Sequence, residues 1–246
     1  MDANAILAQL GISDAEHIEP VTGGADTSIW RVLLGDKFYA LRVFRPEQAE
    51  TCEREVAAME AARAGGVSVP DVIRRGVWEN RPVLLLSWIA GRTLAQQLQN
   101  SPALIWTLGT AFGREQAAIH RLNPPPNFDP TTWIEWAGDE PELKARLYDL
   151  PTRKNRLLHL DFHPLNVMAD GARSARISGV LDWANAQAGD PRADFARTYT
   201  ILRVEPYSPA GDSLLMAVMR RALERAWRDA GRHGAVLRLG GRGDAA

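Results

Sequence analysis

The chain has 246 residues, of which 46% are hydrophobic and 24% charged, a composition that excludes a disordered or collagen-like chain. It carries 29 basic and 30 acidic residues, which excludes the basic balance that is typical of nucleic-acid-binding proteins. Cys52 is the single cysteine, so an internal disulfide is excluded, as expected of a cytoplasmic protein. The N-terminus lacks the basic segment of a signal peptide, and the apolar runs fall far short of the roughly 20 residues that span a membrane. We therefore expect a cytoplasmic protein that binds neither nucleic acid nor membrane.

Strands dominate the first third of the chain. Apolar, β-branched and aromatic residues predict them at 28–34, 38–44, 72–76 and 82–88. The turn signal Gly35-Asp36 joins the first two strands into a hairpin. A helix is expected at 46–64, because proline suits the first turn and apolar residues then recur at three- and four-residue steps. These elements predict a small antiparallel sheet with one inserted helix.

Helices dominate the rest of the chain. Apolar periodicity and capping signals predict them at 93–99, 102–120, 140–149, 192–204 and 213–230, the last ended by Gly231. Short buried strands are expected at 157–160 and 179–181. The Gly-rich tail from Leu239 lacks apolar periodicity, so we expect it to be mobile.

The densest polar cluster in an apolar setting is LLHLDFHPLNVM at residues 157–168. A second apolar strand ends in a carboxylate, Asp182, in the segment GVLDWA. A turn signal lies between the two segments, so their strands can pair and bring Asn166 and Asp182 to the same end. The intervening loop can curl Asp161 over them. Two carboxylates and an amide oxygen form a hard ligand set that suits Mg²⁺ carrying phosphates.

The pattern HLDFHPLNVM followed by GVLDWANAQAGDPRADFA resembles the aminoglycoside phosphotransferase and choline kinase family, which has the protein-kinase-like fold. The resemblance extends over about residues 21–202. It implies a two-lobed α+β fold. The N-lobe, residues 1–90, would be a small antiparallel sheet with one inserted helix that covers the nucleotide. The C-lobe, residues 91–246, would be mainly helical and would hold the catalytic loop, the metal site and the substrate-binding helices.

The resemblance also implies an activity, the ATP-dependent transfer of a γ-phosphoryl group to the hydroxyl of a small molecule. Asp161 matches the catalytic carboxylate, which accepts or orients the proton of the attacking hydroxyl. Asn166 and Asp182 match the residues that hold Mg²⁺. The family's structural positions, which brace the catalytic loop or pack in the core, are matched by His159, Asp190, Asp194 and His120.

Arg42, in YALRVF, occupies the position where the family usually has a lysine that pairs with phosphates and a helix glutamate. Its guanidinium can still contact phosphate. The matching acid is Glu55, with Glu53 as the alternative two residues away. A plain exposed strand arginine is the other interpretation. Leu160 is a second departure, since it replaces the usual glycine before the catalytic Asp.

Two backbone segments complete the expected ATP site. The loop before the first strand resembles a phosphate-covering loop, although it is not a G-x-G-x-x-G sequence, and its contacts would come from Gly23, Gly24, Thr27 and Ser28. The segment LLLSWIA resembles the interlobe hinge, where the Ser87 carbonyl and the Ile89 amide would read the adenine edge. We expect Trp88 to serve in packing.

Residues 123–150 contain six acidic and two basic residues, together with Trp133 and Trp136. Acidic and aromatic groups suit a cationic acceptor, although a solvated helix face with packing tryptophans has the same composition. An amino sugar, a choline-like alcohol, homoserine and a sugar are all possible acceptors.

Two other functions are compatible with these motifs. A nucleotide-binding pseudokinase would keep the fold and serve as an interaction module. A metal-dependent hydrolase could use His159, Asp161 and His163, which alternate along the chain and would share one face of a strand. Pro164 breaks that strand, and we find no second His-rich motif in the sequence to complete the hydrolase site.

Overall fold

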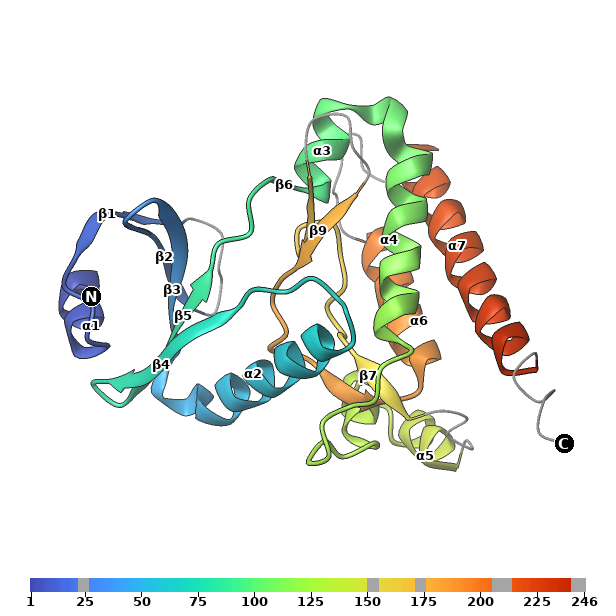
Figure 1. Cartoon of the computed structure of the whole chain (residues 1–246). Helices are drawn as coiled ribbons and strands as arrows, with labels where there is room; N and C mark the ends of the chain where they lie inside the picture. Colours follow the sequence, from blue (N-terminus) through green and yellow to red (C-terminus); the bar gives the residue numbers. More distant parts are fainter. Residues whose placement is uncertain (22–26, 150–154, 171–175, 205–213, 240–246) are drawn as a thin grey trace, which may run out of the picture.

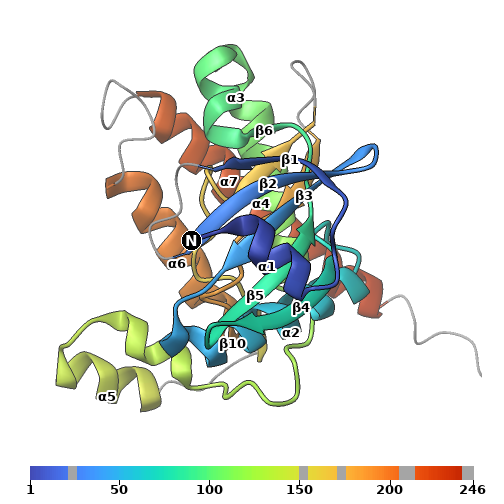
Figure 2. The same ribbon diagram turned by 90° about the vertical axis from the view of Figure 1, so that its left-hand side faces the viewer.

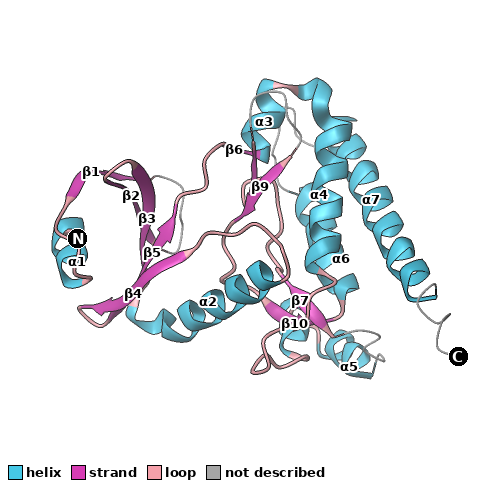
Figure 3. Ribbon diagram, viewed as in Figure 1, coloured by secondary structure: helices cyan, strands magenta, loops and turns pink. Residues whose placement is uncertain are grey.

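The computed structural model describes residues 1–21, 27–149, 155–170, 176–204 and 214–239. Strands gather in the first part of the chain and helices in the second, as Figure 3 shows by colour. Gly23, Gly24 and the tail beyond Leu239 lie outside the described residues.

The first part is built on one antiparallel sheet of five strands in the order β1-β2-β3-β5-β4. Its strands are β1 (Ala15–Pro20), β2 (Ser28–Leu34), β3 (Lys37–Val43), β4 (Val72–Trp78) and β5 (Arg81–Ser87). The expected hairpin is confirmed, since Ser28 on β2 pairs with Val43 on β3. Glu79 and Asn80 have φ values of 46° and 62°, so the β4–β5 turn bends in the sense that suits a tight hairpin.

Two helices cover the two faces of this sheet (Figures 1 and 2). Helix α1 (Ala3–Gln9) buries Ile6 in a cluster with Val83 and Leu85 of β5. The alternate residues Leu84 and Leu86 belong to the main core cluster. Because successive side chains of a strand point to opposite sides, β5 contributes apolar residues to the core clusters on both faces of the sheet. Neither α1 nor β1 was expected from the sequence.

Helix α2 (Ala49–Ala64) is the inserted helix and follows a 3-10 turn at Pro46–Gln48, as expected for 46–64. It buries Cys52, Val56 and Met59 in the main core cluster. Gly65 ends the helix, and its amide donates to carbonyls of the last turn. The opposite side of α2 carries Glu53, which is exposed.

The second part is mainly helical (Figure 1). Its helices are α3 (Leu94–Asn100), α4 (Ile105–Ile119), α5 (Pro141–Asp149), α6 (Pro191–Val204) and α7 (Leu214–Leu239), with 3-10 turns at Pro102–Leu104 and Thr132–Ala137. Two small sheets lie among them. Their strands are β6 (Arg92–Thr93), β7 (Arg156–Leu158), β8 (Val167–Ala169), β9 (Ile177–Val180) and β10 (Gln187–Gly189), paired as β6-β8-β9 and β10-β7.

Helices α4 and α7 pack side by side along the outer edge of the molecule. The two helices approach closely at Gly113, where a Cβ would lie only 2.6 Å from the Leu223 carbonyl oxygen. The prediction that Gly231 ends the last helix is wrong, since α7 continues to Leu239. A glycine inside a helix costs only about 1 kcal/mol relative to alanine, which a long helix tolerates.

None of the helices in the described ranges is long and apolar enough to cross a membrane.

Candidate active site

The β8–β9 hairpin brings Asn166 and Asp182 to one end, as the sequence predicts. Val167 pairs with Val180, and the Leu181 amide donates to the Asn166 carbonyl over 2.8 Å. Asn166 therefore precedes β8 at the same end of the hairpin where Asp182 follows β9. The side chain of Asp182 is 42% exposed, so a ligand can reach it from solvent.

Asp161 lies against Asn166 in the loop before β8. The Asn166 Nδ2 donates to the Asp161 carbonyl over 3.0 Å and to Oδ2 of the same residue over 3.2 Å. Its third contact, with His163 Nε2 at 3.1 Å, also uses Nδ2. The amide oxygen of Asn166 takes part in none of these three contacts.

The Asp161 carboxylate is held in its charged form. Burial opposes this, but His163, then His159 and Arg197, lower the pKa of Asp161 below its ordinary value. His163 Nε2 lies 3.6 Å from Asp161 Oδ2. At neutral pH the carboxylate can therefore accept a hydrogen bond from an incoming hydroxyl.

His159 braces this loop from the buried side. Burial lowers the pKa of its imidazole, so the ring is neutral at neutral pH. Nε2 lies 3.0 Å from the Leu181 carbonyl, to which it donates, and Nδ1 accepts the Asp161 amide at 3.3 Å. Both ring nitrogens are thus used within the chain. In the described ranges no three His, Cys, Asp or Glu side chains are placed to hold a metal ion, so the hydrolase hypothesis receives no support from the structure.

Asp194, fully buried on α6, anchors the same loop. Its Oδ2 accepts the His159 amide and its Oδ1 the Leu160 amide, both over 2.9 Å. His120 Nε2 lies 2.9 Å from Oδ2, and Trp227 Nε1 donates to His120 Nδ1 over 2.9 Å. Since Trp227 can only donate, the ring proton of His120 is on Nε2 and points at Asp194. Despite burial, these bonds lower the pKa of Asp194, with His120 contributing most.

Asp190 begins the helix that carries Asp194. Its Oδ1 accepts the amide of Arg192 over 2.9 Å, and its Oδ2 pairs with the guanidinium of the same residue over 2.7 Å. The bond from the Arg192 amide satisfies one of the free amides in the first turn of α6. The structural roles expected for Asp190 and Asp194 agree with these contacts.

Arg42 bridges the sheet and the β8–β9 hairpin. Its Nη1 pairs with Glu55 Oε1 over 2.5 Å, its Nη2 with Asp182 Oδ1 over 3.0 Å, and its Nε donates to Thr27 Oγ1 over 3.0 Å. The residue is 8% exposed, so the interpretation as a plain exposed arginine is wrong. Glu53, the alternative partner, instead pairs with the exposed Arg75 over 3.4 Å.

Burial sets the electrostatics of this bridge. It raises the pKa of Glu55 to about 7, against the favourable charge of Arg42. It also opposes the charge of Arg42, but Glu55 and Asp182 outweigh that effect and raise the pKa of the guanidinium. A permanently charged guanidinium thus lies beside the carboxylate that was expected to hold a metal.

The donor set at the end of the hairpin fits a hard cation. It offers the Asn166 amide oxygen and the exposed Asp182 carboxylate, and both are oxygen ligands of the type that Mg²⁺ prefers. Phosphate oxygens and waters usually complete such a site.

These features invite comparison with known proteins, and a family profile matches residues 17–234, described as the phosphotransferase enzyme family. The chain belongs to the phosphotransferase enzyme family. The match covers most of the sheet, the Asp161 loop and most of the helical second part, and it confirms the resemblance found in the sequence.

Solved structures and one curated protein resemble this phosphotransferase. An aminoglycoside-3'-phosphotransferase of type VIII has a TM-score of 0.66 and 19% identity, with 92% of each chain covered. A thermostable mutant of aminoglycoside phosphotransferase APH(4)-Ia, in complex with ADP and hygromycin B, has a TM-score of 0.61 and 17% identity, with 92% of this chain and 83% of that chain covered. These likenesses confirm the protein-kinase-like fold.

The curated protein is the uncharacterized protein YcbJ of Bacillus subtilis, which is 30% identical over 69 residues. The matching stretch spans 28% of this chain and 19% of YcbJ.

The expected hinge of this phosphotransferase, residues 84–90, begins within β5 and continues past its last residue, Ser87. Ser87 is tied to Asp71, since its amide donates to the Asp71 carbonyl over 2.8 Å and its Oγ accepts the Asp71 amide over 2.7 Å. Ile89 contacts Gly179, where a Cβ would lie 2.9 Å from the isoleucine Cγ2. The guanidinium carbon of Arg31 lies 5.2 Å from the Trp88 ring centroid, which supports a packing role for Trp88. The adenine contacts of Ser87 and Ile89 stay predictions.

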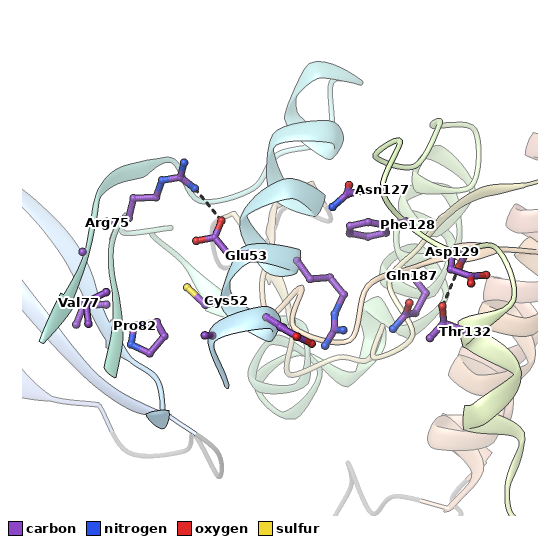
Figure 4. A pocket seen from close by; sticks show the side chains of 15 residues that line it. Cys52, Glu53, Arg75, Val77, Pro82, Asn127, Phe128, Asp129, Thr132 and Gln187 are labelled. Carbon is purple, nitrogen blue, oxygen red and sulfur yellow. Dashed lines mark hydrogen bonds and ion pairs between the residues drawn. The ribbon is translucent and has the colours of Figure 1, made fainter. Parts of the chain in front are cut away.

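A cavity of about 780 Å³ lies beside the first half of α2, and residues of the β4–β5 hairpin and of the segment 127–132 also line it (Figure 4). Cys52 and Phe128 contribute apolar walls, while Glu53 and Arg75 pair at one end (Figure 4). Its lining does not include Asp161, Asn166 or Asp182. The cavity is therefore separate from the candidate active site.

Two arginines near the site were missed in the sequence. Arg54 on α2 donates to the Ala184 carbonyl, two residues after Asp182, over 3.2 Å. Arg197 on α6 donates to the carbonyl of Leu160, the residue before Asp161. The motifs recognised in the sequence do not include either arginine, and only the three-dimensional arrangement reveals their contacts.

Proposed function

We propose that this phosphotransferase transfers the γ-phosphoryl group of ATP to a hydroxyl of a small molecule. The observation that carries the proposal is the bridge in which Arg42 joins Glu55 of the sheet part to Asp182 at the end of the β8–β9 hairpin. The bridge places a fixed positive charge beside the Asp182 carboxylate, which is the charge pattern that nucleotide phosphates and their metal ion require. The ADP bound to the similar APH(4)-Ia enzyme supports the nucleotide assignment.

Asn166 and Asp182 are the residues that would hold Mg²⁺. When bound, this ion supplies neutralisation of the charge that develops on the β- and γ-phosphates. The chain itself contributes Arg42, whose two ion pairs fix the guanidinium in place. Thr27, which accepts a hydrogen bond from Nε, further restricts its orientation.

Asp161 is the proposed catalytic residue. Its carboxylate would accept a hydrogen bond from the attacking hydroxyl and so orient the oxygen toward the γ-phosphorus. Since its pKa is lowered, Asp161 is a weak base. This suits phosphoryl transfer, in which positioning and charge neutralisation contribute more than early proton removal. Asn166 holds the carboxylate through its Nδ2.

A cationic acceptor stays a prediction. Glu135 pairs with Lys144 over 2.6 Å and accepts a hydrogen bond from Tyr148, so its charge is largely balanced within the chain. Trp133 packs against Gly189, where a Cβ would lie 2.3 Å from the indole Cδ1. Packing therefore accounts for this tryptophan. The acceptor panel should include neutral sugars beside amino sugars, choline-like alcohols and homoserine.

Binding and turnover together separate an enzyme from a nucleotide-binding pseudokinase. Calorimetric titration with Mg²⁺-ATP measures binding, and loss of ATP in the presence of each acceptor measures turnover. We expect Asn166→Ala and Asp182→Ala to weaken Mg²⁺-ATP binding, each by about tenfold or more. The matched control is Asn100→Ala, which removes an exposed amide from α3. Binding without turnover of any acceptor would favour the pseudokinase.

A further inference from the structure

Leu160, the residue before Asp161, has an unfavourable backbone conformation. Its φ is 57°, in the left-handed region that glycine adopts freely and that a residue with a Cβ avoids. Its side chain is buried, with 2% exposed. The surrounding structure must therefore hold this backbone in place, because strained residues persist only where their environment fixes them.

Both polar groups of the Leu160 backbone are held by α6. Its amide donates to Asp194 Oδ1 over 2.9 Å, and its carbonyl accepts from Arg197 Nε. Asp194 and Arg197 are three residues apart, which places them on one face of the helix. We call these two side chains, Asp194 and Arg197, the clamp on Leu160. Asp194 is itself held by a bond with His120, so one end of the clamp is rigid.

Asp194 and Arg197 differ in burial and in their other contacts. Asp194 also holds the His159 amide and lies in the buried core. Arg197 is only partly buried, and its side chain lies close enough to Asp161 to lower the pKa of that carboxylate. The Leu160 carbonyl is bonded directly to the peptide nitrogen of Asp161. A rotation of this peptide would therefore displace the Asp161 backbone.

We propose that Arg197 is a positioning residue for Asp161, and that it offsets the strain of a leucine at position 160 by fixing the carbonyl of that residue. The proposal rests on the proposed function in one respect, namely that Asp161 is the catalytic carboxylate. It predicts that the importance of Arg197 depends on the Cβ of residue 160. A glycine there would adopt the same backbone without strain and would need the clamp less.

The test is a set of double mutants that differ only in that Cβ. Arg197→Met keeps an unbranched side chain but removes the donor, and it is combined with the native Leu160, with Leu160→Ala and with Leu160→Gly. Alanine and glycine both remove the buried leucine side chain, so the comparison between them isolates the left-handed strain. Arg220→Met is the matched control, since Arg220 also donates to a backbone carbonyl, that of Leu202 on α6.

Hydrolysis of Mg²⁺-ATP with water as the acceptor gives the first measurement. With leucine or alanine at position 160 we expect Arg197→Met to lower kcat by about tenfold or more and to change the KM for ATP by less than about twofold. With glycine the loss in kcat should shrink to less than about threefold. Equal losses in all three backgrounds would overturn the proposal. Arg220→Met should show no dependence on residue 160.

Urea unfolding of the same proteins gives a second measurement that does not depend on activity. Arg197→Met should lower the unfolding midpoint more with alanine at position 160 than with glycine. If the native chain turns over ATP neither with water nor with any acceptor of the panel but this difference is present, the clamp stands and the proposed function fails. If the midpoint falls equally with alanine and glycine, the clamp is wrong whatever the activity.

Discussion

Arg42 and Asp182 lie 140 residues apart in the chain, yet the guanidinium Nη2 and the carboxylate Oδ1 are 3.0 Å from each other. The same guanidinium holds the buried Glu55. One side chain therefore connects the β3 strand, the α2 helix and the end of the β8–β9 hairpin. This connection links the folding of the sheet to the geometry of the proposed phosphate site.

Arg42→Met should be strongly destabilising, because it leaves the Glu55 carboxyl buried without its cation. We expect a loss of about 3 kcal/mol in the free energy of unfolding, measured by urea denaturation at pH 7. Mg²⁺-ATP affinity should fall as well. Arg45→Met is the control, since Arg45 forms an exposed pair with Glu47 that should be worth less than about 1 kcal/mol. Similar losses for the two variants would contradict the role of the bridge.

The pH dependence of stability should report Glu55. Its pKa is raised from 4.5 in the unfolded chain to about 7 in the folded protein, with burial as the main cause. In the folded state Glu55 thus retains its proton to a higher pH than in the unfolded chain. This contribution to stability is therefore complete below pH 4.5 and is lost as the pH rises through 7. Relative to Glu55→Gln, the native protein should lose roughly 1–3 kcal/mol between pH 5 and pH 8. Urea denaturation without nucleotide measures this, and parallel curves would contradict it.

Asp194 should give the opposite pH dependence. Its folded pKa lies below the ordinary 3.8, with His120 the largest favourable contributor against burial. Its contribution to stability is therefore present above pH 3.8 and is lost as the pH falls through the folded pKa. Asp194→Asn should cost about 3 kcal/mol at pH 7 and progressively less in acid. Asp36→Asn, at an exposed turn position, should change stability by less than about 0.5 kcal/mol.

A glycine beside the expected hinge offers a packing test. Gly91 has a φ of 119°, and a Cβ there would lie 2.5 Å from the Ala169 carbonyl oxygen. Gly138 has a φ of 101°, but no described atom would lie within 4 Å of its Cβ. Thermal unfolding should therefore show a loss of about 2–4 kcal/mol for Gly91→Ala and about 1 kcal/mol for Gly138→Ala. Equal losses would mean that the close contact with Ala169 has no effect.

The β2–β3 hairpin and the pairing of β8 with β9 could be predicted because their signals are local. Each consists of apolar strands on either side of a turn signal. The meeting of Asn166 and Asp182 followed from that pairing. The catalytic role proposed for Asp161 depends instead on resemblance to a family, since a polar loop does not reveal by itself which carboxylate faces a substrate.

Contacts between distant segments were beyond the reach of sequence patterns. The bonds of Arg54 and Arg197 end on backbone carbonyls, which carry no residue-specific signal. Helix α1 was missed because its seven residues are too few to show clear periodicity. The sequence predicts too early an end for α7 because glycine is a common helix stop, although the helix that contains Gly231 packs against α4.

Phosphorus NMR of the native chain with Mg²⁺-ATP and each acceptor of the panel tests the central claim most directly. We predict transfer of the γ-phosphoryl group to a hydroxyl of at least one acceptor. Asp161→Asn should slow this transfer by about a hundredfold or more and leave Mg²⁺-ATP affinity nearly unchanged. Asp170→Asn, in an exposed pair with Arg176, should transfer at the native rate. Transfer by Asp161→Asn at the native rate would contradict the assignment of the active site.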